Sequence, residues 1–131
     1  MPRIVRWYLR TALIMFVLAL VAGVLQALGV AGLTPVYFHL LMVGWVTQFI
    51  MGVAIWMLPK FTQAQPRGSD RISWVGYILL NLGLLLRAAV EPLNALKPGQ
   101  LWGWGLVLSA LLQWLAGLLF VVNAWRRGKE K

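Results

Sequence analysis

The sequence predicts an all-α integral membrane protein, a four-helix bundle whose helices run up-down-up-down. Hydrophobic residues make up 61% of the 131 residues, and the mean hydropathy is +0.79. A water-soluble domain of this size cannot bury so much apolar surface. Four apolar stretches reach the roughly 20 residues that a helix needs to cross a bilayer: 11–32, 35–58, 72–90 and 101–125. They take up most of the chain, so we expect one transmembrane domain over 1–131.

Local signals mark where these helices begin and end. Gly29 and Gly32 are expected to close the first span, and Thr34-Pro35 opens the second as N-cap and first-turn proline. Because this turn is very short, the first two helices must be antiparallel neighbours. Pro92 is expected to stop the third helix, since proline lacks the N–H that continues an α-helix.

The positive charges predict the orientation in the membrane. The net charge is +9, and basic residues gather before the first span, between the second and third, and after the fourth: Arg3, Arg6, Arg10, Lys60, Arg67, Arg71, Arg126, Arg127, Lys129 and Lys131. The positive-inside rule then places both termini in the cytoplasm, and we expect a multi-pass protein of the prokaryotic inner membrane. Contact with anionic lipid headgroups follows from these clusters. Nucleic acid is not an expected partner, because topology already explains the arginines.

His39 is the only histidine, and it lies inside the second span. A charged group at the centre of a membrane helix costs about 2.5–3.5 kcal/mol, so an ionisable residue there faces protein, water or a ligand. Imidazole is also the commonest side-chain ligand of metals. The chain has no cysteine, which excludes disulfides, iron–sulfur clusters and thiolate zinc sites. His39 is therefore the candidate metal ligand.

Two further polar residues are expected at the depth of His39. At a rise of 1.5 Å per residue, His39 lies roughly 6 Å below the outer end of its helix and Arg87 about 8 Å below the same surface. Gln26 falls at a similar level on the first helix. Two structural roles would explain an arginine at position 87 inside a span. Its side chain can extend to the lipid headgroups, or it can form an ion pair with Glu91. The functional alternative is that Arg87 neutralises an anionic group bound beside His39.

A second polar layer, near the bilayer centre, is expected to pack the bundle. It contains Gln48, Asn81 and Gln113, and Gln48 is flanked by Gly44 and Gly52. Small residues four apart let helices approach closely, and a central amide can hydrogen-bond across the contact. At 100° per residue, Gln48 lies 180° from His39. If the glycine face is internal, His39 points out of the protomer.

Residues of the second and third spans resemble subunit I of the heme-copper oxidases, in its divergent cbb3-like and nitric-oxide-response branch. The resemblance rests on His39, on Gly44-Trp45, on the Trp-Met-Leu-Pro-Lys-Phe segment at 56–61, and on the 81–87 and 91–92 segments. It implies that His39 is an axial ligand of a heme, taken here as heme b. It also implies that Arg87 meets a heme propionate. Gln26 is a further candidate for cofactor binding because of its predicted depth.

The chain departs from that family in size and in histidine content. Its four spans and single histidine cannot build a copper site, so we expect no catalytic activity from the isolated chain. A six-coordinate heme needs a second ligand. The candidates are His39 of a second copy, Met42, or a residue of another subunit; otherwise the iron stays five-coordinate and binds a gas. A homodimer sharing one heme needs no further residue.

Three functions follow from these observations. The first is a membrane heme protein for electron transfer or for heme or gas binding, with a respiratory-chain subunit or an electron carrier as partner. The second is an accessory or assembly subunit of a respiratory oxidase complex without its own cofactor. The third is a small oligomeric transporter, which is disfavoured because the central layer offers amides and no ionisable relay.

Overall fold

The structure is an all-helical bundle. The computed structural model describes residues 2–30, 32–58, 70–97 and 99–125, and this part contains no β-strand. The elements are α1 (Arg3–Ala27), α2 (Thr34–His39), the π-helix η1 (Leu40–Thr47), α3 (Gln48–Met57), α4 (Asp70–Leu96) and α5 (Gln100–Trp125). The segments α2, η1 and α3 follow one another without a break and form one rod. The predicted fold class is confirmed.

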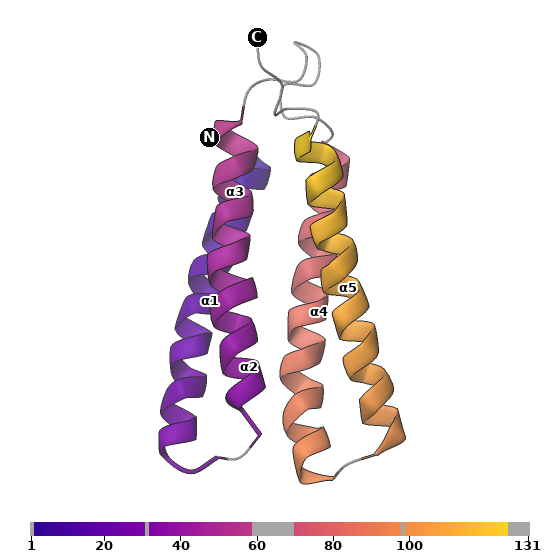
Figure 1. The fold of residues 1–131 in the computed structure, drawn as a ribbon. Coiled ribbons are helices and arrows are strands. Elements are labelled where there is room, and N and C mark those ends of the chain that lie inside the picture. Colours follow the sequence, from indigo (N-terminus) through magenta and orange to yellow (C-terminus); the bar gives the residue numbers. More distant parts are fainter. Residues whose placement is uncertain (1, 31, 59–69, 98, 126–131) are drawn as a thin grey trace.

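Four helical segments are long and apolar enough to cross a membrane: Arg3–Ala27, Thr34–Met57, Arg71–Asn94 and Gln100–Trp125. Successive segments run in opposite directions, and the start of α1 and the end of α5 lie at the same end of the bundle (Figure 1). Which end faces the cytoplasm stays a prediction. The basic residues of 59–69 and 126–131, on which it partly depends, lie outside the described residues.

The two predicted helix ends have different outcomes. Gly29 and Gly32 have φ values of +96° and +81°, so the chain turns after Ala27 through backbone conformations that suit glycine. The predicted stop at Pro92 is wrong, because α4 continues through Pro92 to Leu96. The fixed φ of proline is compatible with a helix, although its missing N–H removes one backbone hydrogen bond and its ring crowds the carbonyl four residues earlier. Membrane helices tolerate that loss when neighbouring groups satisfy the freed carbonyl.

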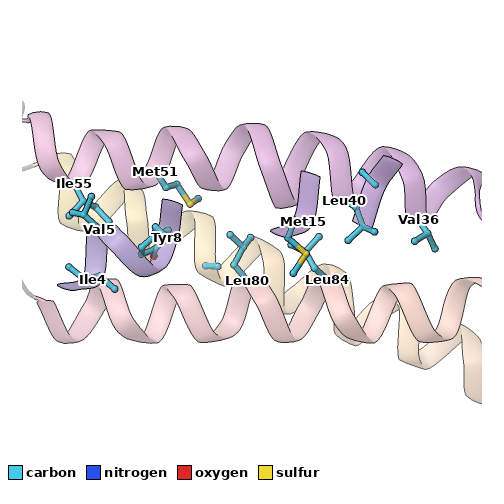
Figure 2. Close-up of a cluster of buried hydrophobic side chains, with 12 residues drawn as sticks. Ile4, Val5, Tyr8, Met15, Val36, Leu40, Met51, Ile55, Leu80 and Leu84 are labelled. Carbon is cyan, nitrogen blue, oxygen red and sulfur yellow. The ribbon is translucent and has the colours of Figure 1, made fainter. Parts of the chain in front are cut away.

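The core is a column of side chains between the two helical hairpins. Figure 2 shows the buried residues of this column, which come from α1, from the α2–η1–α3 rod and from α4, with Ala116 from α5. Met15 and Leu84 are 4% and 1% exposed, and Leu40 lies in the same cluster. The outer faces of all helices carry exposed aliphatic side chains. This distribution suits a bundle whose outer surface contacts lipid.

Glycines permit the close approach of helices within each hairpin. A Cβ added to Gly44 would lie 2.9 Å from Met15 Cβ, and one added to Gly52 would lie 2.9 Å from Tyr8 Cβ. Between α4 and α5, a Cβ on Gly83 would lie 3.0 Å from the Ser109 carbonyl oxygen. Distances of 2.9 Å are essentially never seen for real Cβ atoms and 3.0 Å is unusually tight, so a larger residue at any of these crossings would force neighbouring atoms to shift.

Tyr8 lies in the core, whereas its place near the end of the first span is typical of an interfacial aromatic residue. It is 2% exposed, and its hydroxyl donates to the Ser73 carbonyl oxygen at 2.9 Å. Close by, the Thr11 and Tyr77 hydroxyls share a hydrogen bond. These contacts join α1 to α4 and so connect the two hairpins at the end where the chain begins.

Candidate functional site around His39

His39 is the last residue of α2 and is half-buried. Its Nδ1 lies 3.0 Å from the carbonyl oxygen of Pro35, one turn earlier. A carbonyl oxygen can only accept, so Nδ1 carries the proton and donates it. In the neutral ring the lone pair is then on Nε2, the nitrogen that can bind a metal. Ligating histidines commonly donate their second ring N–H to a carbonyl in this way, which fixes the orientation of the ring.

The π-helix η1 begins directly after His39. Its i→i+5 bonding places more residues in each turn, so every residue advances by less than the 100° of an α-helix. Hydroxyl and amide side chains bond its carbonyls: Thr47 donates to Met42 O at 2.8 Å, and Gln48 Nε2 donates to Gly44 O at 2.8 Å. The 180° separation predicted between His39 and Gln48 therefore does not apply. Short π segments are frequent at functional sites.

Gln26 bonds to the first turn of α2. Its Nε2 donates to the hydroxyl of Thr34, the residue before Pro35. This bond fastens the end of α1 to the segment whose carbonyl holds the His39 ring. The Gln26 amide nitrogen is thus used within the protein, and no hydrogen bond joins Gln26 to His39 among the described residues.

Arg87 forms an ion pair with Glu91. Nη2 of Arg87 lies 2.8 Å from Oε1 of Glu91, and the two side chains are 19% and 12% exposed. The i, i+4 pair anticipated from the sequence is therefore present. The Nε atom of Arg87 is buried and has no hydrogen-bond partner among the described residues. One donor of this guanidinium is thus left for a further acceptor.

Met42, the other candidate ligand, lies in η1 and is 52% exposed. Its thioether is open to the surroundings of the protomer. It is therefore more accessible to a group bound on the outer surface of the rod than to one inside the bundle.

The layer at the bilayer centre is a set of bonds between helices. Asn81 Nδ2 on α4 donates to Gln48 Oε1 at 2.7 Å, and Ser109 Oγ on α5 donates to the Gly83 carbonyl at 2.7 Å. Gln113 Nε2 donates to Ser109 Oγ at 3.1 Å. The packing of Gly44, Gln48 and Gly52, all buried, is as the sequence predicts.

His39 and Arg87 each fit a heme in their donor chemistry. His39 offers a neutral Nε2 with its tautomer fixed, and Arg87 offers an unpaired buried N–H for an anion. Two hollows in the described part of the chain lie elsewhere. One, at the other end of the bundle, includes Ile55 and Phe120; the other is a surface groove at Gln100, Gly103, Trp104 and Val107.

Comparison with known proteins gives one match. The family model described as cytochrome c and quinol oxidase polypeptide I matches residues 3–131. No curated protein and no solved structure matches the chain. The matched region includes all the candidate residues: Gln26, His39, Met42 and Arg87.

Proposed function

We propose, because this chain belongs to the cytochrome c and quinol oxidase polypeptide I family, that it is a membrane protein that binds heme b through His39. The observation that carries the proposal is the hydrogen bond from His39 Nδ1 to Pro35 O at 3.0 Å. This bond leaves Nε2 unprotonated and holds the ring in one orientation. A bound heme would supply one-electron redox chemistry at that position.

Arg87 is the proposed partner of a heme propionate. A guanidinium can bond a carboxylate through two parallel N–H groups. The Nη2 atom already bonds Glu91, while Nε is buried without a partner. A propionate that accepts from Nε would satisfy this donor and would share the guanidinium with Glu91.

The second axial ligand is proposed to be His39 of a second copy. One histidine per chain and a half-buried ring suit a symmetric pair in which both imidazoles reach one iron from opposite sides. Ligation by two imidazoles would leave no open position for an exogenous ligand. The role proposed is therefore electron transfer, between an electron carrier and a respiratory-chain subunit of a prokaryotic inner membrane. Met42, with its exposed thioether, is the alternative ligand.

A cofactor-free accessory subunit of a respiratory oxidase complex is the second candidate. It is favoured because the polar side chains predicted at the depth of His39 already have partners within the chain. Gln26 bonds Thr34, Arg87 pairs with Glu91, and His39 bonds Pro35. These bonds lower the free-energy cost of burying polar groups in a membrane, and they need no ligand to do so. In this function His39 would only bond its own helix.

Absorbance spectra of the purified protein, oxidised and dithionite-reduced, separate the two candidates. We expect a heme spectrum in the wild type and in Phe38→Ala, which changes the exposed neighbour of His39. We expect no heme spectrum in His39→Ala. A wild-type protein that is purified from heme-replete cells and shows no heme absorbance would favour the accessory subunit.

A further inference from the structure

The middle of α5 carries an unpaired donor and an unpaired acceptor beside each other. Trp114 is 62% exposed, and its indole N–H has no hydrogen-bond partner among the residues that the structure covers. Gln113 is half-buried and donates from Nε2 to Ser109, while its Oε1 accepts no bond from the described parts of the chain. Both residues lie about 20 Å from either end of the 26-residue helix.

This position is unusual for tryptophan. In membrane proteins, tryptophans gather at the two interfaces, where the ring is apolar and the N–H meets water. At the bilayer centre no water is available, and lipid tails offer no acceptor. The N–H of Trp114 therefore needs a protein acceptor that its own chain does not provide in this structure.

The helix face around Trp114 has room for another helix. The residues that follow the 3-4 spacing of one helix face through Trp114 are Gly103, Val107, Ala110, Trp114, Gly117 and Val121. A Cβ added to Gly103 or Gly117 would meet no atom within 4 Å, unlike one added to Gly44, Gly52 or Gly83. The surface groove at Gly103 and Val107 lies on the same face. Small residues on an exposed membrane helix allow a second backbone to approach closely.

We propose that this face of α5 is the contact between two copies of the chain. In an isologous pair, the Trp114 N–H of each copy would donate to Gln113 Oε1 of the other. A two-fold axis along the membrane normal makes this exchange reciprocal, so one contact satisfies all four groups. A second copy matches the requirement in full, because it presents the missing acceptor and the missing donor at the same depth.

The contact is compatible with a heme shared between two copies, although it does not rest on one. In Figure 1, α3 lies in front of α1 and α5 lies in front of α4. The α3 part of the rod and the helix α5 thus lie on one side of the bundle in this view, while α2, which carries His39, lies between α1 and α4. A two-fold axis on that side can bring the rod and α5 to the same dimer.

The absence of cysteine allows a direct test by single-cysteine crosslinking in membranes. A disulfide needs Cβ atoms about 3.5–4.5 Å apart, so it reports close approach at each position. Ala110→Cys and Gly117→Cys should form covalent dimers on mild oxidation. Leu108→Cys and Leu115→Cys, two residues (about 3 Å) along the helix and about 160° around it from positions 110 and 117, are the exposed controls and should stay monomeric.

The polar pair is tested separately by dimer dissociation in detergent. Trp114→Phe keeps the ring and removes the N–H, and it should raise the dissociation constant roughly five- to tenfold through the loss of two symmetric bonds. Trp7→Phe, at an exposed tryptophan of α1, should leave the constant unchanged. No crosslink at positions 110 and 117, or equal crosslinking at 108 and 115, would overturn the proposal. The crosslinking is repeated in the His39→Ala background, so that loss of heme and loss of the α5 contact are distinguished.

Discussion

Asn81 on α4 donates a hydrogen bond of 2.7 Å to Oε1 of Gln48, the first residue of α3. This bond joins the two hairpins near the bilayer centre, next to the end of the π-helix. Gln48 is completely buried, and its Nε2 is bonded to Gly44 O. Both atoms of the Gln48 amide are therefore used, and the residue acts in packing.

Removing one partner of this bond should destabilise the bundle. Asn81→Leu leaves Gln48 Oε1 buried without a donor, and we expect a loss of about 1–2 kcal/mol in the free energy of unfolding. The double variant Gln48→Leu/Asn81→Leu should recover part of that loss, because no unpaired atom remains at the contact. Unfolding in detergent by SDS titration measures both. A double variant less stable than the sum of the single changes would contradict this assignment.

The crossing of α4 and α5 should be intolerant of a methyl group. Gly83→Ala places a Cβ about 3.0 Å from Ser109 O and 3.2 Å from Leu112 Cβ, atoms that cannot move independently of α5. We expect a cost of about 1–3 kcal/mol, typical of overpacking. Gly103→Ala, which meets no atom within 4 Å, is the control and should keep wild-type stability in dilute detergent. Equal melting temperatures for the two variants would show that α4 and α5 do not pack as described.

The sequence predicts the four helices well because apolar runs of this length have few alternatives in a chain without soluble segments. It also predicts the buried face of Gly44, Gln48 and Gly52, since small residues at a four-residue spacing indicate close contact. The π-helix could not be predicted, because it depends on side chains bonding backbone carbonyls and leaves no pattern in hydropathy. Its presence invalidates the angle assumed between His39 and Gln48.

Other features depend on tertiary contacts that local sequence signals do not report. Tyr8 lies where an interfacial aromatic is expected, and only its contact with Ser73 reveals that it is buried. Pro92 marks a helix end by local rules, while the structure continues the helix. For Arg87 the sequence left two explanations open. The ion pair with Glu91 is now observed, and the propionate contact stays a prediction.

Arg87 and Glu91 should have separable effects on a bound heme. Arg87→Leu removes the proposed propionate partner and should lower heme retention or shift the midpoint potential, while Arg87→Lys should do less damage because the charge stays. Glu91→Gln breaks the ion pair but keeps the guanidinium, so heme content should stay near the wild-type level. Heme content and redox titration of the three variants measure this. Normal heme content and potential in Arg87→Leu would mean that the arginine only pairs with Glu91.

The orientation of the bundle should follow its arginines. Basic residues lie at the end of the bundle where α1 begins, and the positive-inside rule places that end in the cytoplasm. A reporter that is active only in the cytoplasm, fused after Lys131, should be active. A reporter that needs export should be inactive at the same site. The reverse pattern would contradict the proposed topology.

The proposal of a shared heme is tested most directly by the ratio of heme to protein chain in the purified dimer. One His39 per chain, with Nδ1 bonded to Pro35 and Nε2 free, predicts one low-spin heme for every two chains. Pyridine hemochrome analysis and amino-acid quantification of the same sample give this ratio. We expect 1:2 in the wild type and no heme in His39→Ala, with a weakened dimer. A monomer with a full heme per chain, or a His39→Ala variant with an unchanged spectrum, would contradict the account.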